Sequence, residues 1–294
     1  MDNRFECVPC AICGQQNAEL LMKGSGPACV VRCRNDGLLY QSPRPKAAII
    51  REKLKTFVRP DNLELFSGYR RAMLRREARA IQQLKPGGSL LDIGCATGTL
   101  FEFFQGSGWR LHGVDTSQTG VELAARQYRA EVFCGTLQEA RYPCRSFDVV
   151  SILDTLFYDP QPDRELLDIR RLLKDDGLLA LEIPGHTYRM MRERGPLCWL
   201  LNRRWVRGFA NSGHLYFFSP HTIRLLLANA GFHVVRVVPE QASMSMGNWG
   251  LVLNHLHFAA ARLLFGLTAG RLSIAGKELY LAVKAAADGD ADGS

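Results

Sequence analysis

The sequence predicts an α/β fold in which helices cover both faces of a mostly parallel, doubly wound sheet. Two observations lead to this prediction. Short apolar runs such as residues 89–93 alternate with helix-like segments from about residue 86 to residue 286, which is the pattern of strand–helix–strand units. The first apolar run is followed by G-C-A-T-G at 94–98, and Asp115 lies 21 residues beyond Gly94. This arrangement is typical of a nucleotide-binding turn between the first strand and the first helix.

The acidic residue identifies the kind of ligand. In a doubly wound sheet, an acid about 20 residues beyond the glycines ends the second strand and accepts hydrogen bonds from ribose hydroxyls. Asp115 follows the apolar segment 110–114 and has this position. Gly94 and Gly98 allow the backbone to approach a ligand closely. We therefore expect a cofactor that carries adenosine.

The glycine spacing is wrong for a dinucleotide, because Gly94, Ala96 and Thr99 occupy the positions that need glycine or alanine. Instead, the segment L-L-D-I-G-C-A-T-G-T-L at 90–100 resembles the first motif of the class I S-adenosylmethionine-dependent methyltransferases, and the likeness extends over about 69–284. This resemblance implies a seven-stranded Rossmann-like sheet whose last strand is antiparallel. It also implies S-adenosylmethionine as cofactor. Two nearby carboxylates suit a ligand with a sulfonium and an ammonium, whereas they would repel a pyrophosphate.

The resemblance also implies roles for individual residues. Asp92 would face the amino-acid part of the cofactor, Asp115 would hold the ribose, and the turn at 135–137 would receive the adenine. Tyr69 would be a lid residue on a helix across the cofactor mouth, although a packed tyrosine on a solvated helix is an equal alternative. The predicted cofactor residues are Tyr69, Asp92, Gly94, Cys95, Gly98, Asp115, Thr116, Gly135, Thr136, Leu137, Leu153 and Asp154.

Each element follows from apolar periodicity and from turn residues. Strands are predicted at 89–93, 110–115, 132–135, 147–153, 177–183, 233–238 and 277–285. Helices are predicted at 46–58, 66–84, 98–105, 117–128, 161–173 and 220–230. We expect four regions: a zinc-binding-like module (1–45), a basic helical linker or lid (46–85), the methyltransferase domain (86–286, with insertions at 187–213 and 241–275) and a disordered tail (287–294).

The first 45 residues contain a candidate zinc site. Five of the nine cysteines lie in the first 33 residues, and such clustering favours a metal in a reducing compartment. Cys10-x-x-Cys13-Gly is half of a zinc knuckle, and Cys33-x-x-Asp36-Gly is an altered second half. The region resembles the zinc-binding module ahead of some sugar and natural-product methyltransferases. We favour Cys10, Cys13, Cys33 and Asp36 as ligands, with Cys29 and Cys7 as rivals for Asp36 and a metal-free fold with buried thiols as the alternative.

The positive charge is concentrated in one segment. The chain has a net charge of +8, and residues 44–85 contain twelve basic against four acidic side chains. A basic patch can bind RNA, but we find no nucleic-acid module and no run of exposed aromatic residues in the sequence.

The sequence also contains three catalytic candidates. Relatives carry Glu-His at the loop after the fourth strand, where this chain has Phe157 and Tyr158. An unactivated tyrosine is a poor base at neutral pH. His214, in a glycine-containing loop where relatives have a similar histidine, is therefore the first candidate, His186 the second and Tyr158 the third. A histidine that only bonds a turn is as good an interpretation of His214.

Two insertions contain the remaining signals. The first has Arg192, Arg194, Arg203, Arg204 and Arg207 interleaved with Trp199 and Trp205, and arginine favours phosphate and carboxylate. The second predicts a helix at 251–267 with an apolar face, too polar to cross a bilayer. That helix could make a peripheral membrane contact, cap an apolar pocket, pair with another chain or pack on its own core.

The sequence thus predicts methyl transfer from S-adenosylmethionine, with oxygen of a small-molecule, sugar or lipid-linked metabolite as the preferred acceptor. The alternatives are a nucleic-acid methyltransferase and a non-catalytic methyltransferase-like partner subunit. The polar residues 1–6 are unlike a secretory signal, so we expect a cytoplasmic protein with or without membrane association. The sequence leaves the oligomeric state open.

Overall fold

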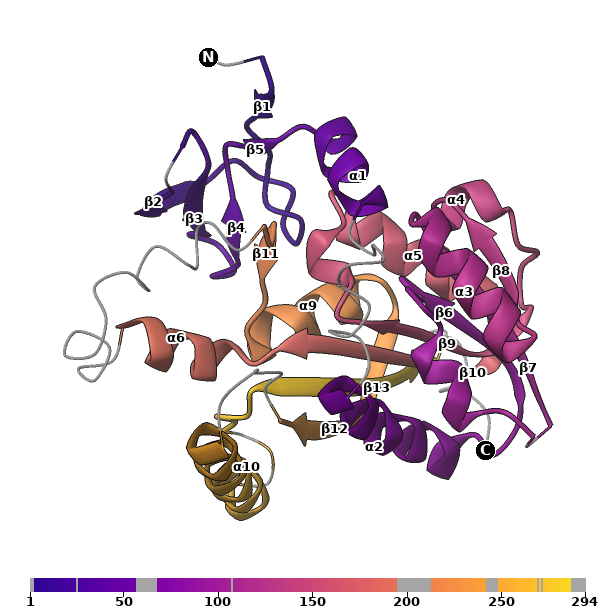
Figure 1. Ribbon diagram of the computed structural model, residues 1–294. Helices are drawn as coiled ribbons and strands as arrows, with labels where there is room; N and C mark the ends of the chain where they lie inside the picture. The colour runs from indigo at the N-terminus through magenta and orange to yellow at the C-terminus, as the bar shows by residue number, and fades with distance from the viewer. Residues whose placement is uncertain are drawn as a thin grey trace, which may run out of the picture.

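A seven-stranded sheet forms the centre of the protein (Figure 1). The computed structural model describes residues 3–24, 26–56, 68–106, 108–194, 213–241, 248–268, 270 and 272–286. The strands of the central sheet are β6 (Gly88–Ile93), β7 (Trp109–Asp115), β8 (Glu131–Cys134), β9 (Phe147–Leu153), β10 (Leu173–Pro184), β12 (Phe232–Glu240) and β13 (Lys277–Lys284). Their order across the sheet is β12-β13-β10-β9-β6-β7-β8.

The direction of the strands confirms the predicted topology. Strands β6, β7, β8, β9 and β10 pair in parallel, while β13 lies antiparallel to both β10 and β12. Strands β7 and β8 are added on one side of β6, and β9 and β10 are added on its other side, so the strand order reverses at β6. In open α/β sheets, ligands bind beyond the carboxyl ends of the strands at such a switch point.

Helices pack on both faces because alternate strand residues point to opposite sides. On one face, α2 (Gly68–Leu84), the short 3-10 helix η2 (Thr99–Phe103) and α3 (Gln118–Tyr128) share a core with Leu90 and Val149. On the other face, α5 (Pro162–Leu172) and α9 (Pro220–Asn229) pack with Leu91 and Val150. The continuous apolar runs in the sequence are explained by this burial on both faces.

One predicted helix is wrong in type. The segment 98–105 forms only the 3-10 helix η2, which begins after Gly98 in a left-handed conformation (φ 73°) and has no side-chain cap. Two further short helices follow strands at the same edge of the sheet: α4 (Leu137–Ala140) after β8 and the 3-10 helix η3 (Leu156–Tyr158) after β9.

The amino-terminal module contains a four-stranded sheet in the order β11-β4-β3-β2. Three strands come from this module, β2 (Ala18–Lys23), β3 (Cys29–Cys33) and β4 (Leu39–Gln41), and β11 (Tyr216–Phe217) comes from much later in the chain. A separate pair is formed by β1 (Phe5–Glu6) and β5 (Arg44–Pro45), and α1 (Ala47–Lys55) follows it. The Tyr216 hydroxyl accepts a hydrogen bond from Arg44 at 2.9 Å. The module and the central domain are therefore joined through a shared sheet.

The two predicted insertions are described in part. Helix α6 (His186–Arg194) begins the first, and α10 (Asn248–Leu267) occupies most of the second, beside the β12 edge (Figure 1). Trp199, Trp205, Arg203, Arg204, Arg207 and the predicted tail at 287–294 lie outside the described residues. None of the helices in the described ranges is both long enough and apolar enough to cross a membrane.

Candidate cofactor and acceptor site

A cavity of about 2620 Å³ opens at the carboxyl ends of the central strands. Its walls include the glycine turn after β6, Asp115 after β7 and the turn after β8. The cavity continues past the loop after β9 to the amino-terminal module, where Cys10 and Arg44 line it. One space therefore connects the predicted cofactor site to the module that precedes the domain.

The glycine turn lies close to the loop after β9. Gly94 has φ 73°, and its amide donates to the Val114 carbonyl at 2.8 Å. A Cβ on Gly94 would lie 2.3 Å from Thr155 Oγ1. Both the left-handed conformation and the close approach require glycine at this position.

Asp115 is held in a fixed orientation at the cavity wall. Its Oδ2 accepts the Ala96 amide at 2.9 Å and its Oδ1 accepts the Ser117 amide at 2.8 Å. Burial raises the pKa of this carboxyl, and the amide bonds from Ser117 and Ala96 oppose that rise. Each carboxylate oxygen can accept a further bond, so this side chain is suited to two neighbouring hydroxyls such as those of a ribose.

The turn after β8 forms the next part of the wall. Gly135, Thr136 and Leu137 all line the cavity. The Thr136 side chain caps α4 in a reciprocal arrangement with Glu139, and the Gly135 amide donates to the Asp115 carbonyl at 2.9 Å. These bonds fix the turn beside Asp115, at the position where the resemblance implies the adenine.

Three of the predicted cofactor residues do not line the cavity. The buried Asp92 accepts a hydrogen bond from Ser151 at 2.7 Å, and burial raises its pKa to about 7. Cys95 is buried and packs beneath the turn, and Gly98 lies against Ala124. These residues support the turn from below. The side chain of Tyr69 is outside the described part of the chain, whereas Thr116, Leu153 and Asp154 line the cavity.

Asp154 is the centre of a partly buried group of charges that the sequence did not reveal. It has a positive φ of 56°. Its Oδ2 accepts Arg70 Nη1 at 2.6 Å and also pairs with Lys277. These two cations keep the pKa of Asp154 below its ordinary value despite the desolvation. Arg70 and Lys277 line the cavity as well, and neither belonged to a motif.

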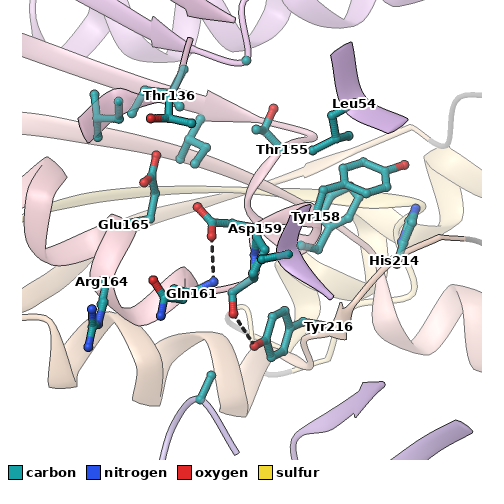
Figure 2. A pocket seen from close by; sticks show the side chains of 18 of the residues that line it. Leu54, Thr136, Thr155, Tyr158, Asp159, Gln161, Arg164, Glu165, His214 and Tyr216 are labelled. Carbon is teal, nitrogen blue, oxygen red and sulfur yellow. Dashed lines mark hydrogen bonds between the residues drawn. The ribbon is translucent and has the colours of Figure 1, made fainter. Parts of the chain in front are cut away.

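The acceptor end of the cavity contains two of the three catalytic candidates. Figure 2 shows Tyr158 and His214 side by side, and their ring centroids are 4.9 Å apart. Burial and the Asp154 charge raise the pKa of Tyr158 to about 12. Burial and the Arg189 charge lower the pKa of His214 to about 3. At neutral pH the tyrosine is therefore protonated and the histidine is neutral.

His186 lies apart from this pair. It begins α6 and borders a small separate pocket with Arg189 and Phe217, not the main cavity. Burial and the Arg189 charge lower its pKa.

Comparison with known proteins decides the family. Residues 65–237 match the profile of a family described as a methyltransferase domain, which is more than half of the chain. The chain belongs to this methyltransferase family. Its seven-stranded sheet with an antiparallel last strand is the Rossmann-like methyltransferase fold that the sequence predicted.

Curated relatives match only part of the methyltransferase. The mitochondrial ubiquinone biosynthesis O-methyltransferase of Schizosaccharomyces pombe is 29% identical over 109 residues, which are 34% of this chain and 39% of that protein. The ubiquinone biosynthesis O-methyltransferase of Glaesserella parasuis is 28% identical over 112 residues, 34% of this chain and 47% of that protein. The chain thus spans less than half the length of each of these relatives.

Solved structures agree on the fold. A SAM-dependent methyltransferase from Thermotoga maritima has a TM-score of 0.54 at 20% identity and covers 80% of this chain and 99% of its own. Another from Archaeoglobus fulgidus has a TM-score of 0.52 at 19% identity, covering 75% and 97%.

The methyltransferase also carries a four-residue cluster in its amino-terminal module. The ligand atoms of Cys10, Cys13, Cys33 and Asp36 all lie within 4.8 Å of one another. Asp36 Oδ2 is 3.2 Å from Cys10 Sγ and 3.3 Å from Cys33 Sγ, and the Cys13 and Cys33 sulfurs are 3.6 Å apart. Ligand atoms bound to one tetrahedral zinc lie roughly 3.6–3.8 Å apart at usual bond lengths.

The backbone around the cluster forms two similar turns. The Gly14 amide donates to the Cys10 carbonyl and the Gly37 amide to the Cys33 carbonyl, at 2.9 and 3.1 Å. The rival ligands are elsewhere: Cys29 is at the opposite end of β3 and Cys7 is exposed.

Proposed function

We propose that this methyltransferase transfers the methyl group of S-adenosylmethionine to an oxygen of a small-molecule, sugar or lipid-linked metabolite. The observation that carries the proposal is the single cavity, which begins at Asp115 and Gly94 and continues to Tyr158 and His214. A cofactor at the first end would present its reactive group to an acceptor at the second.

The residues at the first end fit the proposed cofactor. Asp115 would hold the ribose hydroxyls, the turn at 135–137 would contact the adenine, and Asp154 with Arg70 would face the charged amino-acid part. When bound, S-adenosylmethionine supplies a methyl carbon that is already activated by its sulfonium. The chain has to orient the acceptor, exclude water and remove a proton.

Oxygen is the preferred acceptor atom because the two curated relatives described above are named O-methyltransferases. The acceptor end of the cavity contains aromatic rings and hydrogen-bonding groups, including Phe157, Tyr158 and Tyr216. This mixture suits a metabolite with a ring or an acyl part.

The nucleic-acid alternative has less support, because six of the twelve basic residues in segment 44–85 form ion pairs in the described part of the chain. Arg70 pairs with Asp154 at 2.6 Å, Arg76 with Glu240 at 2.8 Å and Lys85 with Asp176 at 2.5 Å. Charges paired in this way contribute little to a phosphate-binding surface.

We also propose that Cys10, Cys13, Cys33 and Asp36 bind one zinc ion. Three sulfurs and a carboxylate on two glycine-closed turns fit a closed tetrahedral site, which is structural because no coordination position is open. Since Cys10 and Cys13 border the cavity, the metal would also fix one wall of the acceptor site.

Helix α10 is our candidate for a peripheral membrane or lipid contact. Leu256, Leu263 and Leu267 are 62%, 65% and 77% exposed, whereas Ala261 on the opposite side is 0% exposed. At 100° per residue the three leucines lie within about 40° of one another. An ordinary surface helix turns its apolar side chains toward the core. Helix α10 instead turns these leucines toward solvent, as an interfacial helix does before it binds a membrane.

Two measurements test the proposed function. Isothermal titration calorimetry should show that the purified protein binds S-adenosylmethionine. Metabolite comparison between a deletion strain and its parent should then reveal a compound that differs by one methyl group. If the protein binds no cofactor, the proposal is wrong.

A further inference from the structure

Two carboxyl groups are buried together beneath the cavity. Glu77 lies on α2 and Glu182 lies near the carboxyl end of β10, and both side chains are 0% exposed. The two carboxyl groups face each other. Within the described ranges, none of their four oxygens has a hydrogen-bond partner. Two adjacent buried carboxyl groups without donors cannot both ionise, and a proton shared between them satisfies both.

The pair connects to the cavity through Lys277. Lys277 Nζ lies 2.5 Å from Glu182 Oε1 and also pairs with Asp154. Lys277 and Asp154 both line the cavity. Across the sheet, Glu182 pairs in register with Leu153, the residue before Asp154. A continuous path of polar groups therefore leads from the cavity to the buried carboxyl pair.

A charge count around the pair supports a shared proton. The groups facing it are Arg70 and Arg76 from α2, Asp154 after β9, Glu240 from β12 and Lys277 from β13. Arg76 and Glu240 neutralise each other at 2.8 Å. The remaining cations, Arg70 and Lys277, face three carboxyl groups, so one bound proton makes the buried group neutral. Burial raises the pKa of Glu77 and of Glu182.

We infer that Glu77 and Glu182 form a proton-accepting site that receives the proton released by methyl transfer, with Asp154 and Lys277 as the route. The inference rests on the proposed function. It assigns the role of base to the buried carboxyl pair in place of His214 and Tyr158.

The proposed step balances in atoms and charge. The acceptor oxygen forms its bond to the methyl carbon as the bond between that carbon and sulfur breaks, and the electron pair of the broken bond stays on sulfur. The acceptor proton passes to Oδ1 of Asp154, since both cations contact Oδ2. Lys277 gives one of its protons to the carboxyl pair and takes the proton from Asp154.

The electrostatic consequence favours this route. The sulfonium loses one positive charge during the reaction, and the carboxyl pair gains one proton. The total charge of the buried region is therefore unchanged, which avoids the cost of creating an uncompensated charge in a low-dielectric site. The proton leaves when the neutral product S-adenosylhomocysteine is replaced by the cationic cofactor.

Calorimetry tests the inference without an acceptor. Binding of S-adenosylmethionine and of S-adenosylhomocysteine is measured at pH 7 in phosphate and in Tris, whose ionisation enthalpies differ, to count protons. Wild-type protein should take up more protons with S-adenosylhomocysteine than with S-adenosylmethionine, by a difference of up to about one. The double variant Glu77→Gln, Glu182→Gln should abolish the difference, because no carboxyl group remains in the pair to accept the second proton. Should this variant not fold, Glu77→Met combined with Glu182→Gln is expected to give the same loss.

Glu240→Gln is the matched control, since Glu240 is 1% exposed on the adjacent strand but has Arg76 as its own partner. It should keep the proton difference. Equal proton counts in the wild type, or an unchanged difference in the variant that lacks both carboxyl groups, would overturn the inference while the proposed function stands. Failure of both ligands to bind would overturn the proposed function and the inference together.

Discussion

Arg189 Nη1 lies 2.7 Å from Nδ1 of His214. A guanidinium can only donate, so Nδ1 accepts and the proton of the neutral imidazole is on Nε2. His214 can therefore donate a hydrogen bond to an acceptor or product, but it is badly placed to take a proton. Our sequence-based prediction of His214 as general base remains untested, and this geometry favours a positioning role.

The first prediction concerns the protonation of His214. Because burial and Arg189 lower its pKa to about 3, its ring resonances in NMR should not titrate between pH 5 and pH 8. The unfolded chain does take up this proton below about pH 6.5, so the free energy of unfolding should fall as the pH decreases below that value. His214→Gln should make this fall smaller. A ring signal that titrates near pH 6.5 would contradict the assignment.

The second prediction concerns Asp115. Asp115→Ala should weaken S-adenosylmethionine binding roughly tenfold to a hundredfold, because hydrogen bonds to a charged group contribute about 1.5–3 kcal/mol each. Calorimetry measures the change. Asp115→Asn is the control for the turn, since an amide oxygen can still accept the Ala96 or Ser117 amide. If affinity is unchanged in the alanine variant, the ribose lies elsewhere.

The third prediction concerns the metal. Protein purified without chelator should contain about one zinc per chain by elemental analysis. Cys13→Ser should lose most of this zinc and lower the melting temperature, whereas Asp36→Cys should retain it, because it restores a fourth thiolate. Cys29→Ser is the control and should leave the zinc content unchanged. Zinc-free protein with wild-type stability would show that the cluster is not a metal site.

The fourth prediction concerns α10. Leu263→Ser should reduce co-sedimentation with anionic liposomes and leave the melting temperature close to that of the wild type, because this side chain is 65% exposed. Ala261→Ser, at a position that is 0% exposed, should lower the melting temperature and leave co-sedimentation unchanged. If both variants lower stability and neither changes sedimentation, the helix only completes the fold.

Much of the fold could be predicted because the central strands are buried on both faces. The run 147–153 is apolar except for Asp148 and Ser151, and β9 has the same bounds. Strand β11 was missed, since two residues show no periodicity. Its partners lie in β4, far away in the sequence.

The cofactor half of the site could also be predicted, because its signal is local in the sequence. The strand–turn–helix unit fixes the spacing between Gly94 and Asp115. The bonds of Asp154 to Arg70 and Lys277 span 84 and 123 residues, and only tertiary packing brings these groups together. Glu77 and Glu182 likewise look like ordinary helix and strand residues until the sheet forms.

The pairing of β11 with β4 affects how the chain folds during synthesis. Arg44 and Tyr216 are 172 residues apart, so during synthesis the amino-terminal sheet has an open edge until most of the polypeptide has left the ribosome. Contacts of such long separation form late and leave unpaired strand edges exposed to aggregation. We expect nascent chains that stop before residue 216 to need a chaperone, while those that extend past residue 217 can close the sheet themselves.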